Sequence, residues 1–243
     1  MKNPYRWDNL TSPQIKKLSE EGAIVLVPVG STEQHGPHLP VGTDALMATS
    51  MSEKLAAALG EKGVPCVVAP TIAVANSTHH MSFAGSLTLR PETYLALLRD
   101  YCHSIASHGF RKILLVNGHG GNIAPTNTAL ISINEELGFP VYFTGYWQAS
   151  GQAEQEILET QKGMIHACEE ETSLVLALDD SLVDPIYKET KGNPGHGSPM
   201  LDKGVWETFH RMEAHTENGG MGNSYAATKE KGEALTKRMV EDL

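Results

Sequence analysis

The feature that most constrains the fold is an alternation of apolar runs and helical segments between residues 23 and 147. The apolar runs have the length of strands and cover 23–30, 65–74, 111–118 and 140–147. Segments whose apolar residues recur at helical spacing lie between and around them, at 12–22, 44–60, 90–109, 123–138 and 168–179. Uninterrupted apolar strands are typical of parallel sheets that are covered on both faces. We therefore predict an α/β fold with a mostly parallel sheet and helices on both sides.

The length and charge of the chain limit its organisation and its partners. It has 243 residues, 40% of them hydrophobic, and shows no internal repeat or low-complexity linker, so we expect a single domain over residues 1–243. Lys and Arg number 19 against 29 Asp and Glu, which gives a formal charge of −10. Phosphate backbones and anionic lipids repel an acidic surface, so we expect neither nucleic acid nor membrane as a partner.

Cysteine usage and hydropathy indicate the compartment. The three cysteines form no C-x-x-C pair and no disulfide framework. No run approaches the roughly 20 apolar residues of a membrane span. These features predict a soluble, cytoplasmic protein.

Metal-seeking side chains follow two of the predicted strands. Glu33, His35 and Asp44 come after the first strand, and His119 lies in the segment NGHGGN after the third. Ligands of open α/β sheets bind outside the carboxyl ends of the strands, and residues two apart in an extended segment point to the same side. Such a mixed oxygen and nitrogen site suits Zn²⁺, Mn²⁺ or Fe²⁺. Taken singly, Asp44 could be a helix N-cap and His119 a turn residue.

A third segment, GMIHACEEETS, adds further candidates. His166 and Glu170 lie four residues apart, so a helix could pair them on one face. If the helix begins after Cys168 instead, Glu171 points inward while Glu169 and Glu170 are solvated. An acidic first turn also suits the helix dipole without any further role. The sequence leaves these alternatives open.

Three motifs together resemble the creatininase (creatinine amidohydrolase) family of metal-dependent hydrolases. They are VPVGSTEQHGPHLPVGTD, LLVNGHGGN and HACEEETS, and weaker echoes extend over nearly the whole chain in the same order. The resemblance implies a three-layer α/β/α sandwich and a homo-oligomer, since family members often form hexamers. It also implies a cofactor of two divalent metal ions. The implied metal ligands are Glu33, His35, Asp44, His119 and Glu171, with Asp44 bridging the pair, and the implied acid or base is His166.

Departures from creatininase itself concern the substrate. Gly121 stands where creatininase carries a Glu, and Lys162, Gly163 and Ile165 replace the Trp and acidic residues that grip creatinine. Trp147 is the aromatic residue that could line the pocket. The metal chemistry therefore transfers better than the substrate. Other family branches hydrolyse a formamide, trim a peptide or open small cyclic compounds.

The predicted reaction is hydrolysis of a C–N bond in a small molecule, either an amide, a cyclic amide or a formamide. The metal ions are expected to activate a water that attacks the carbonyl carbon, while His166 gives a proton to the leaving nitrogen. Ser77 and His80, at the end of the second strand, could contact the substrate. The alternatives within the family are opening of a lactone or cyclic ketone, and a metal-dependent peptidase.

Two other classes of protein remain open. A serine hydrolase could use Ser31 or Ser77, although the G-x-S-x-G elbow is missing. A binding module could hold a structural metal, although structural zinc usually prefers sites rich in cysteine. Loss of turnover on chelation, restored by Mn²⁺ or Zn²⁺, would favour the metallohydrolase over both.

Overall fold

The computed structural model describes residues 3–192 and 208–243, and these cluster into two compact units. The first, called the sheet unit, consists of Met1–Ser31, Asp44–Asn76 and Leu89–Tyr146. The second, called the loop unit, consists of Thr32–Thr43, Ser77–Thr88 and Trp147–Leu243.

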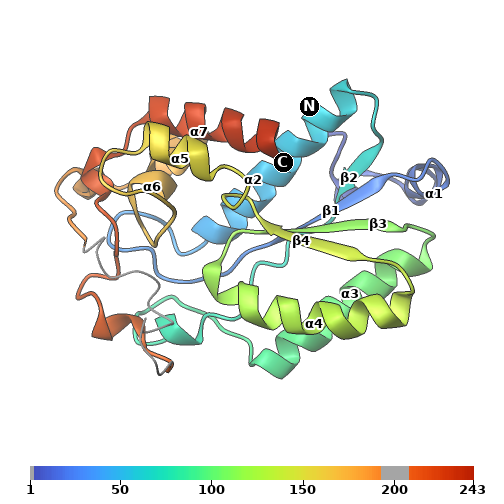
Figure 1. Cartoon of the computed structure of the whole chain (residues 1–243), viewed down its shortest axis with the longest axis horizontal. Helices are drawn as coiled ribbons and strands as arrows, with labels where there is room; N and C mark the ends of the chain where they lie inside the picture. Colours follow the sequence, from blue (N-terminus) through green and yellow to red (C-terminus); the bar gives the residue numbers. More distant parts are fainter. Residues whose placement is uncertain (1–2, 193–207) are drawn as a thin grey trace. The chain divides into compact units, whose positions relative to one another are not determined.

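A four-stranded parallel sheet forms the centre of the sheet unit (Figure 1). Its strands are β1 (Ile24–Val29), β2 (Cys66–Val68), β3 (Lys112–Asn117) and β4 (Val141–Gly145). Their order is β2-β1-β3-β4. The predicted α/β class with a parallel sheet is confirmed, and each strand lies inside one of the four predicted apolar runs.

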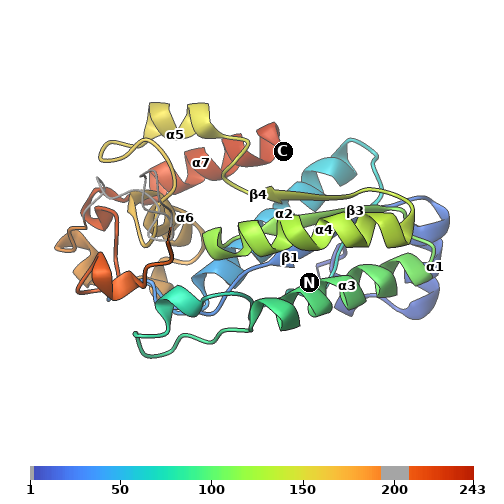
Figure 2. The same cartoon turned by 60° about the horizontal axis from the view of Figure 1, so that its bottom comes forward.

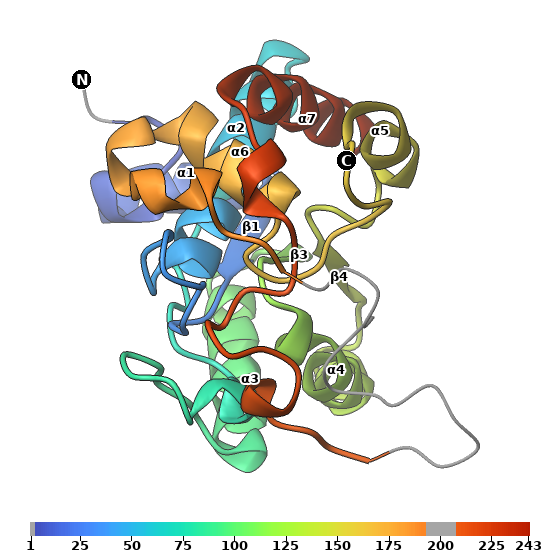
Figure 3. The same ribbon diagram turned by 90° about the vertical axis from the view of Figure 1, so that its left-hand side faces the viewer.

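Helices cover both faces of this sheet, as Figure 3 shows with the strands seen obliquely from one end. α3 (Pro91–Ser107) and α4 (Ile123–Leu137) lie on one side, and α2 (Thr43–Glu61) lies on the other. α1 (Ser12–Glu20) contributes Ile15 and Leu18 to the apolar cluster that α3 and α4 form with the sheet. Alternate residues of β1, namely Val25, Val27 and Val29, belong to this cluster. The period of two in a strand therefore sends every second side chain to this face.

Two glycines let the beginning of α2 approach the strand ends closely. A Cβ at Gly30 would lie 2.4 Å from the Cα of Ala45, and one at Gly118 would lie 2.4 Å from the carbonyl oxygen of Asp44. Only a residue without a side chain fits at such distances. The first turn of α2 therefore packs directly against the segments that leave β1 and β3, which carries Asp44 to the carboxyl ends of the strands.

In its described residues, the loop unit holds three helices and several short 3₁₀ turns. They are α5 (Gly151–Ile157), α6 (Glu169–Leu178) and α7 (Lys229–Asp242). α5 lies beside α7 in Figure 2, and Arg238 of α7 forms an ion pair with Glu156 of α5 at 3.1 Å. No helix of the described ranges combines the length and the apolar character that crossing a bilayer requires.

β2 is much shorter than its predicted extent, and α5 was not among the predicted helices. β2 ends at Val68, whereas the apolar run continues to Val74, because Pro70 has no N–H to donate to the neighbouring strand. Pairing resumes only as an isolated bridge between Ile72 and Val29. α5 was not predicted at all, since seven residues carry too little apolar periodicity to reveal a helix.

Candidate metal centre

Asp44 and His119 form a buried pair in the sheet unit. The Nδ1 atom of His119 lies 3.2 Å from Oδ2 of Asp44, and its Nε2 atom lies 3.0 Å from the carbonyl oxygen of Asn76. A carbonyl oxygen can only accept, so Nε2 carries the hydrogen and Nδ1 of the neutral ring carries the lone pair. Histidines that bind metals typically give their other N–H to such an acceptor.

Two buried asparagines hold the backbone around this pair. The side chain of Asn117 donates to the carbonyl oxygen of His119 at 2.7 Å and accepts from the amide of His119 at 3.2 Å. Asn122 donates to the carbonyl oxygen of Gly30 at 3.0 Å and accepts from the amide of Asn76 at 3.2 Å. The carbonyl that orients the His119 ring is therefore itself fixed. Both asparagines belong to the NGHGGN segment, but the sequence did not indicate this role.

In the loop unit, the candidate site includes Glu33 and His35, and both side chains are fully buried. The segment turns at Gly36, whose φ of +62° favours glycine, and the amide of Glu33 donates to the carbonyl oxygen of Val41 at 2.8 Å. Nδ1 of His35 lies 3.0 Å from the carbonyl oxygen of Glu33, so this nitrogen is the donor. The lone pair of His35 is therefore on Nε2, which lies 3.9 Å from Oε1 of Glu171.

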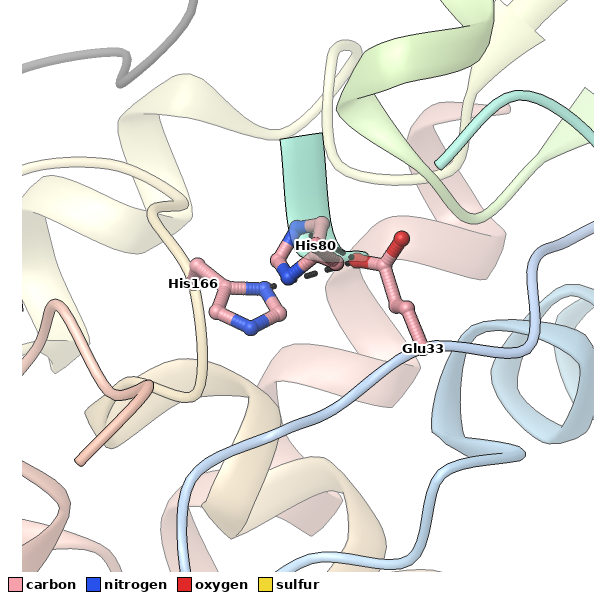
Figure 4. Close-up of side chains that lie close together, drawn as sticks. All are labelled: Glu33, His80 and His166. Atoms are coloured by element: carbon pink, nitrogen blue, oxygen red, sulfur yellow. Dashed lines mark ion pairs between the residues drawn. The ribbon is translucent and has the colours of Figure 1, made fainter. Parts of the chain in front are cut away.

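The carboxylate of Glu33 lies among polar groups from three other segments. Oε2 accepts a hydrogen bond from the Ser77 hydroxyl at 2.6 Å. Oε1 lies 3.2 Å from Nε2 of His80 and 3.7 Å from Nδ1 of His166 (Figure 4). Ser77 and His80, which were predicted to contact the substrate, thus both contact the predicted metal ligand Glu33.

Hydrogen bonds of both its ring and its backbone carbonyl fix the position of His166. Its Nε2 atom lies 2.8 Å from the carbonyl oxygen of Gln34, so Nε2 is the donor and Nδ1 faces Glu33. Its carbonyl oxygen accepts from the amide of Met221 at 2.9 Å. The next residue, Ala167, has a φ of +49°, which is uncommon for a residue with a side chain. Such an outlier at a cluster of histidines and carboxylates is typical of functional sites.

Glu171 is in the first turn of α6, the position from which a Glu side chain can reach back to the preceding backbone. Its Oε2 atom accepts from the amide of Ala167, while Oε1 faces His35. The structure therefore selects Glu171, rather than Glu170, as the carboxylate that lies beside the histidines.

The expectation that Glu169 and Glu170 are solvated is wrong, because both are fully buried. Burial, together with the nearby Glu154 carboxylate, raises the pKa of Glu170 well above its usual value. Burial also acts to raise the pKa of Glu169, but hydrogen bonds that include one from Lys231 of α7 at 2.7 Å lower it overall. These two side chains join α6 to its neighbours instead of facing water.

Two groups in the loop unit could each hold a metal ion. One is Glu33 with His80 and His166, and the other is His35 with His166 and Glu171. In each group, one ligand atom per residue lies within 4.8 Å of the others. Buried carboxylates and imidazoles that converge in this way are the donor set that Zn²⁺, Mn²⁺ and Fe²⁺ use, so the residues fit such an ion.

Most of the predicted site residues thus lie close to one another inside one of the two units. The loop unit brings together Glu33, His35, Ser77, His80, His166 and Glu171, and the sheet unit pairs Asp44 with His119. Trp147 is half-buried, and its contact with a substrate stays a prediction. Sequence reasoning missed Gln34, whose buried side-chain amide lies 2.8 Å from Nδ1 of His80. Its position between Glu33 and His35 in the sequence was the available signal.

Comparisons with known proteins give consistent results. A family model described as "Creatininase: Creatinine amidohydrolase" matches residues 8–243. The "Mycofactocin precursor peptide peptidase" of Mycobacterium ulcerans is 31% identical over 224 residues, which cover 90% of this chain and 82% of that protein. The "Creatinine amidohydrolase" of Pseudomonas putida is 26% identical, covering 93% and 89%. A crystal structure of creatinine amidohydrolase (creatininase) superimposes with a TM-score of 0.83 at 25% identity, covering 98% of this chain and 94% of that one.

Proposed function

Because the chain belongs to the creatininase family of hydrolases, we propose that it uses two divalent metal ions to hydrolyse a C–N bond in a small molecule. The bond is an amide, a cyclic amide or a formamide. The observation that supports this most is the position of His166 beside two proposed ligands: its Nδ1 atom lies 3.7 Å from Oε1 of Glu33, and its ring centroid lies 4.4 Å from that of His35.

The proposed metal ligands are those of the sequence prediction: Glu33, His35, Asp44, His119 and Glu171. The carbonyl anchors of His35 and His119 support this assignment, because each leaves the lone pair on the nitrogen that faces a carboxylate. That all five residues share one centre, with Asp44 as the bridge, stays a prediction. Zn²⁺, Mn²⁺ and Fe²⁺ remain the candidate ions.

The residues of the chain would divide the chemistry between them. The metal ions, when bound, supply an acidified water and polarise the carbonyl group of the substrate. His166 handles the proton at Nδ1, since its Nε2–H is used by the carbonyl of Gln34. Ser77 and His80 orient Glu33, and their proposed contact with the substrate, like that of Trp147, is a further role that awaits testing.

A peptidase is the second candidate function. The 31% identical relative from Mycobacterium ulcerans carries the name of a peptidase, and the match covers most of both chains. A peptide bond is also a C–N bond to a carbonyl, so the same metal ions and the same His166 would serve it. Opening of a lactone or cyclic ketone, the remaining alternative, uses the same attack on a carbonyl carbon.

A turnover screen separates these candidates. The Zn²⁺- or Mn²⁺-loaded protein is offered cyclic amides, formamides, short peptides, lactones and cyclic ketones, and product formation is followed by mass spectrometry. We expect turnover of cyclic amides or formamides, which chelation abolishes and added metal restores. Turnover of peptides alone would select the second candidate. Activity that survives chelation but is blocked by a serine acylating agent would contradict the metal-dependent mechanism.

The organisation of the protein completes the proposal. We propose one family domain over residues 1–243, which the continuous family match over 8–243 supports. We also propose a homo-oligomer, of which a hexamer is one form, and a cytoplasmic location. Light scattering coupled to size-exclusion chromatography would give the number of subunits.

A further inference from the structure

Gln34 lies between two proposed metal ligands in the sequence, yet its side chain has no part in the proposed reaction. It is 5% exposed, and its amide contacts residues from three separate segments of the loop unit. We propose that Gln34 is a positioning residue that decides which ring nitrogen of His80 carries the hydrogen, and thereby holds the carboxylate of Glu33 in place. The effect on metal binding rests on the proposed function, whereas the effect on His80 does not.

The first step is the orientation of the Gln34 amide, which two contacts fix from opposite sides. Its Oε1 atom accepts from the backbone amide of Gly36 at 2.9 Å, and that amide can only donate. Its Nε2 atom donates to the carbonyl oxygen of Gly219 at 3.1 Å, and that oxygen can only accept. In the reverse orientation the NH₂ group would face the N–H of Gly36, and the amide oxygen would face the carbonyl oxygen of Gly219. Donor would then meet donor and acceptor would meet acceptor, so this orientation is excluded.

The second step concerns the remaining hydrogen of the Gln34 amide. Nε2 of Gln34 lies 2.8 Å from Nδ1 of His80, and an amide nitrogen donates only, so Nδ1 of His80 is the acceptor. Nε2 of Gln34 also lies 3.0 Å from Nε2 of His166. That nitrogen already donates to the carbonyl of Gln34, so this second approach is a contact between two donors and not a hydrogen bond.

The third step leads to Glu33. With Nδ1 acting as an acceptor, the hydrogen of a neutral His80 ring is on Nε2, which lies 3.2 Å from Oε1 of Glu33. Ser77 donates to Oε2 of the same carboxylate at 2.6 Å. Oε2 of Glu33 therefore receives a hydrogen bond from Ser77, whereas Oε1 lies in electrostatic contact with the Nε2–H of His80. That the hydrogen of His80 is on the nitrogen nearest this oxygen depends on the donor that Gln34 supplies.

The space around Gln34 is consistent with a fixed amide. Gly219 has a φ of +88°, and a Cβ built there would lie 1.8 Å from Oε1 of Gln34. Any side chain at position 219 would displace the amide. The turn at Gly219 thus accommodates Gln34 both by its backbone conformation and by the absence of a side chain.

The substitution Gln34→Glu tests the assignment directly, because it replaces the N–H donor with a second acceptor of the same size. The ring nitrogens of His80 are observed in the full-length protein labelled with ¹⁵N-histidine, with and without Zn²⁺, and are assigned by comparison with His80→Gln. We expect the wild type to carry hydrogen on Nε2 of His80. In Gln34→Glu we expect Nδ1 to become protonated. The same substitution at another buried glutamine, Gln161→Glu, is the control and should leave His80 unchanged.

A second variant covers the case in which Gln34→Glu does not fold. Gln34→Met keeps the volume of the side chain and removes both of its hydrogen-bonding groups. We expect its affinity for Zn²⁺, measured by competition with a chelator, to fall about 10- to 100-fold, as is usual when a group that orients a metal ligand is lost. Gln161→Met serves as the control and should bind Zn²⁺ like the wild type.

Two outcomes would overturn the proposal: an unprotonated Nδ1 of His80 in Gln34→Glu, or wild-type affinity in Gln34→Met. A wild-type protein that binds no Zn²⁺ would contradict the proposed function instead. The measurement on His80 would still decide the role of Gln34 in that case.

Discussion

A single buried imidazole, that of His38, shows how one residue can tie stability to pH. Burial and the nearby His35 lower the pKa of His38 to about 4, and Asp184 offsets this only in part. Nε2 of His38 lies 2.9 Å from the hydroxyl of Thr172. His38 is therefore neutral in the folded protein at pH 7, whereas in the unfolded chain its pKa is the ordinary 6.5. Below pH 6.5 the unfolded state binds the proton more tightly, so acid favours unfolding.

The first prediction at this scale concerns the variant His38→Gln. For the wild type, the two pKa values imply a loss of about 2 kcal/mol of unfolding free energy between pH 7 and pH 5. This contribution should vanish in His38→Gln. Urea unfolding at both pH values, in the presence of a chelator so that metal release does not contribute, gives the difference. The control is His103→Gln, since His103 is exposed. An equal pH dependence in His38→Gln and the wild type would refute the assignment.

Some residues of the candidate site could be predicted from the sequence, and others could not. Glu33 and His35 were predicted together from their spacing along an extended segment, whereas Glu171 was predicted from its place in the motif HACEEETS; its carboxylate lies 3.9 Å from the His35 ring. Gln34 could not be predicted, since its partners His80 and Gly219 lie 46 and 185 residues away in the chain. The distinction between Glu170 and Glu171 depended on where α6 begins, and a shift of one residue on a helix turns a side chain by about 100°.

At the scale of elements, the contact between α6 and α7 depends on a glycine. A Cβ at Gly232 of α7 would lie 1.9 Å from the carbonyl oxygen of Ser173 in α6. Glycine normally weakens a helix, so its presence here is explained by the close approach of the two helices. Lys231, the preceding residue, forms its ion pair with the buried Glu169 of α6 at 2.7 Å.

The prediction at this scale is that Gly232→Ala destabilises the protein. Alanine is the better helix former by about 1 kcal/mol, yet the added methyl group must push α7 away from α6. We expect a net loss of about 1–3 kcal/mol of unfolding free energy, measured by urea unfolding, as is usual for overpacking. The matched control is Gly151→Ala in α5, where a Cβ would meet nothing within 4 Å. Stabilisation by Gly232→Ala would show that the helices can separate without cost.

The elements of the sheet unit were predictable because each combines a strand-length apolar run or a long helical period with clear end signals. α2, for example, runs over Thr43–Glu61 where the sequence predicted 44–60. The seven-residue α5 is too short for such periodicity, and β2 is cut short by a proline within its run. Local backbone chemistry, rather than the hydrophobic pattern, decided these cases.

At the scale of the whole molecule, the proposed ligands come from widely separated parts of the chain, between Glu33 and Glu171. A metal ion that binds only when these residues are folded adds its binding free energy to the stability of the native state. The thermal stability of the protein should therefore depend on metal.

We expect Zn²⁺ or Mn²⁺ at about 100 times its dissociation constant to raise the Tm of the wild type by about 5–10 °C. His35→Ala and Asp44→Ala should lose metal by elemental analysis and show a smaller rise. His166→Ala should keep its metal but lose most turnover, because its proposed role is proton transfer. His103→Ala, at an exposed position, is the control. Full metal occupancy in His35→Ala and Asp44→Ala would contradict their assignment as ligands.

The turn at residues 219–222 has a consequence for synthesis. Gly219 receives the amide of Gln34, and the amides of Met221 and Gly222 support the backbone of His166. A growing chain that has already emerged through Glu171 still lacks these bonds. Ion capture should therefore follow the synthesis of this turn, and a chain truncated before it should carry all five proposed ligands without holding them in place.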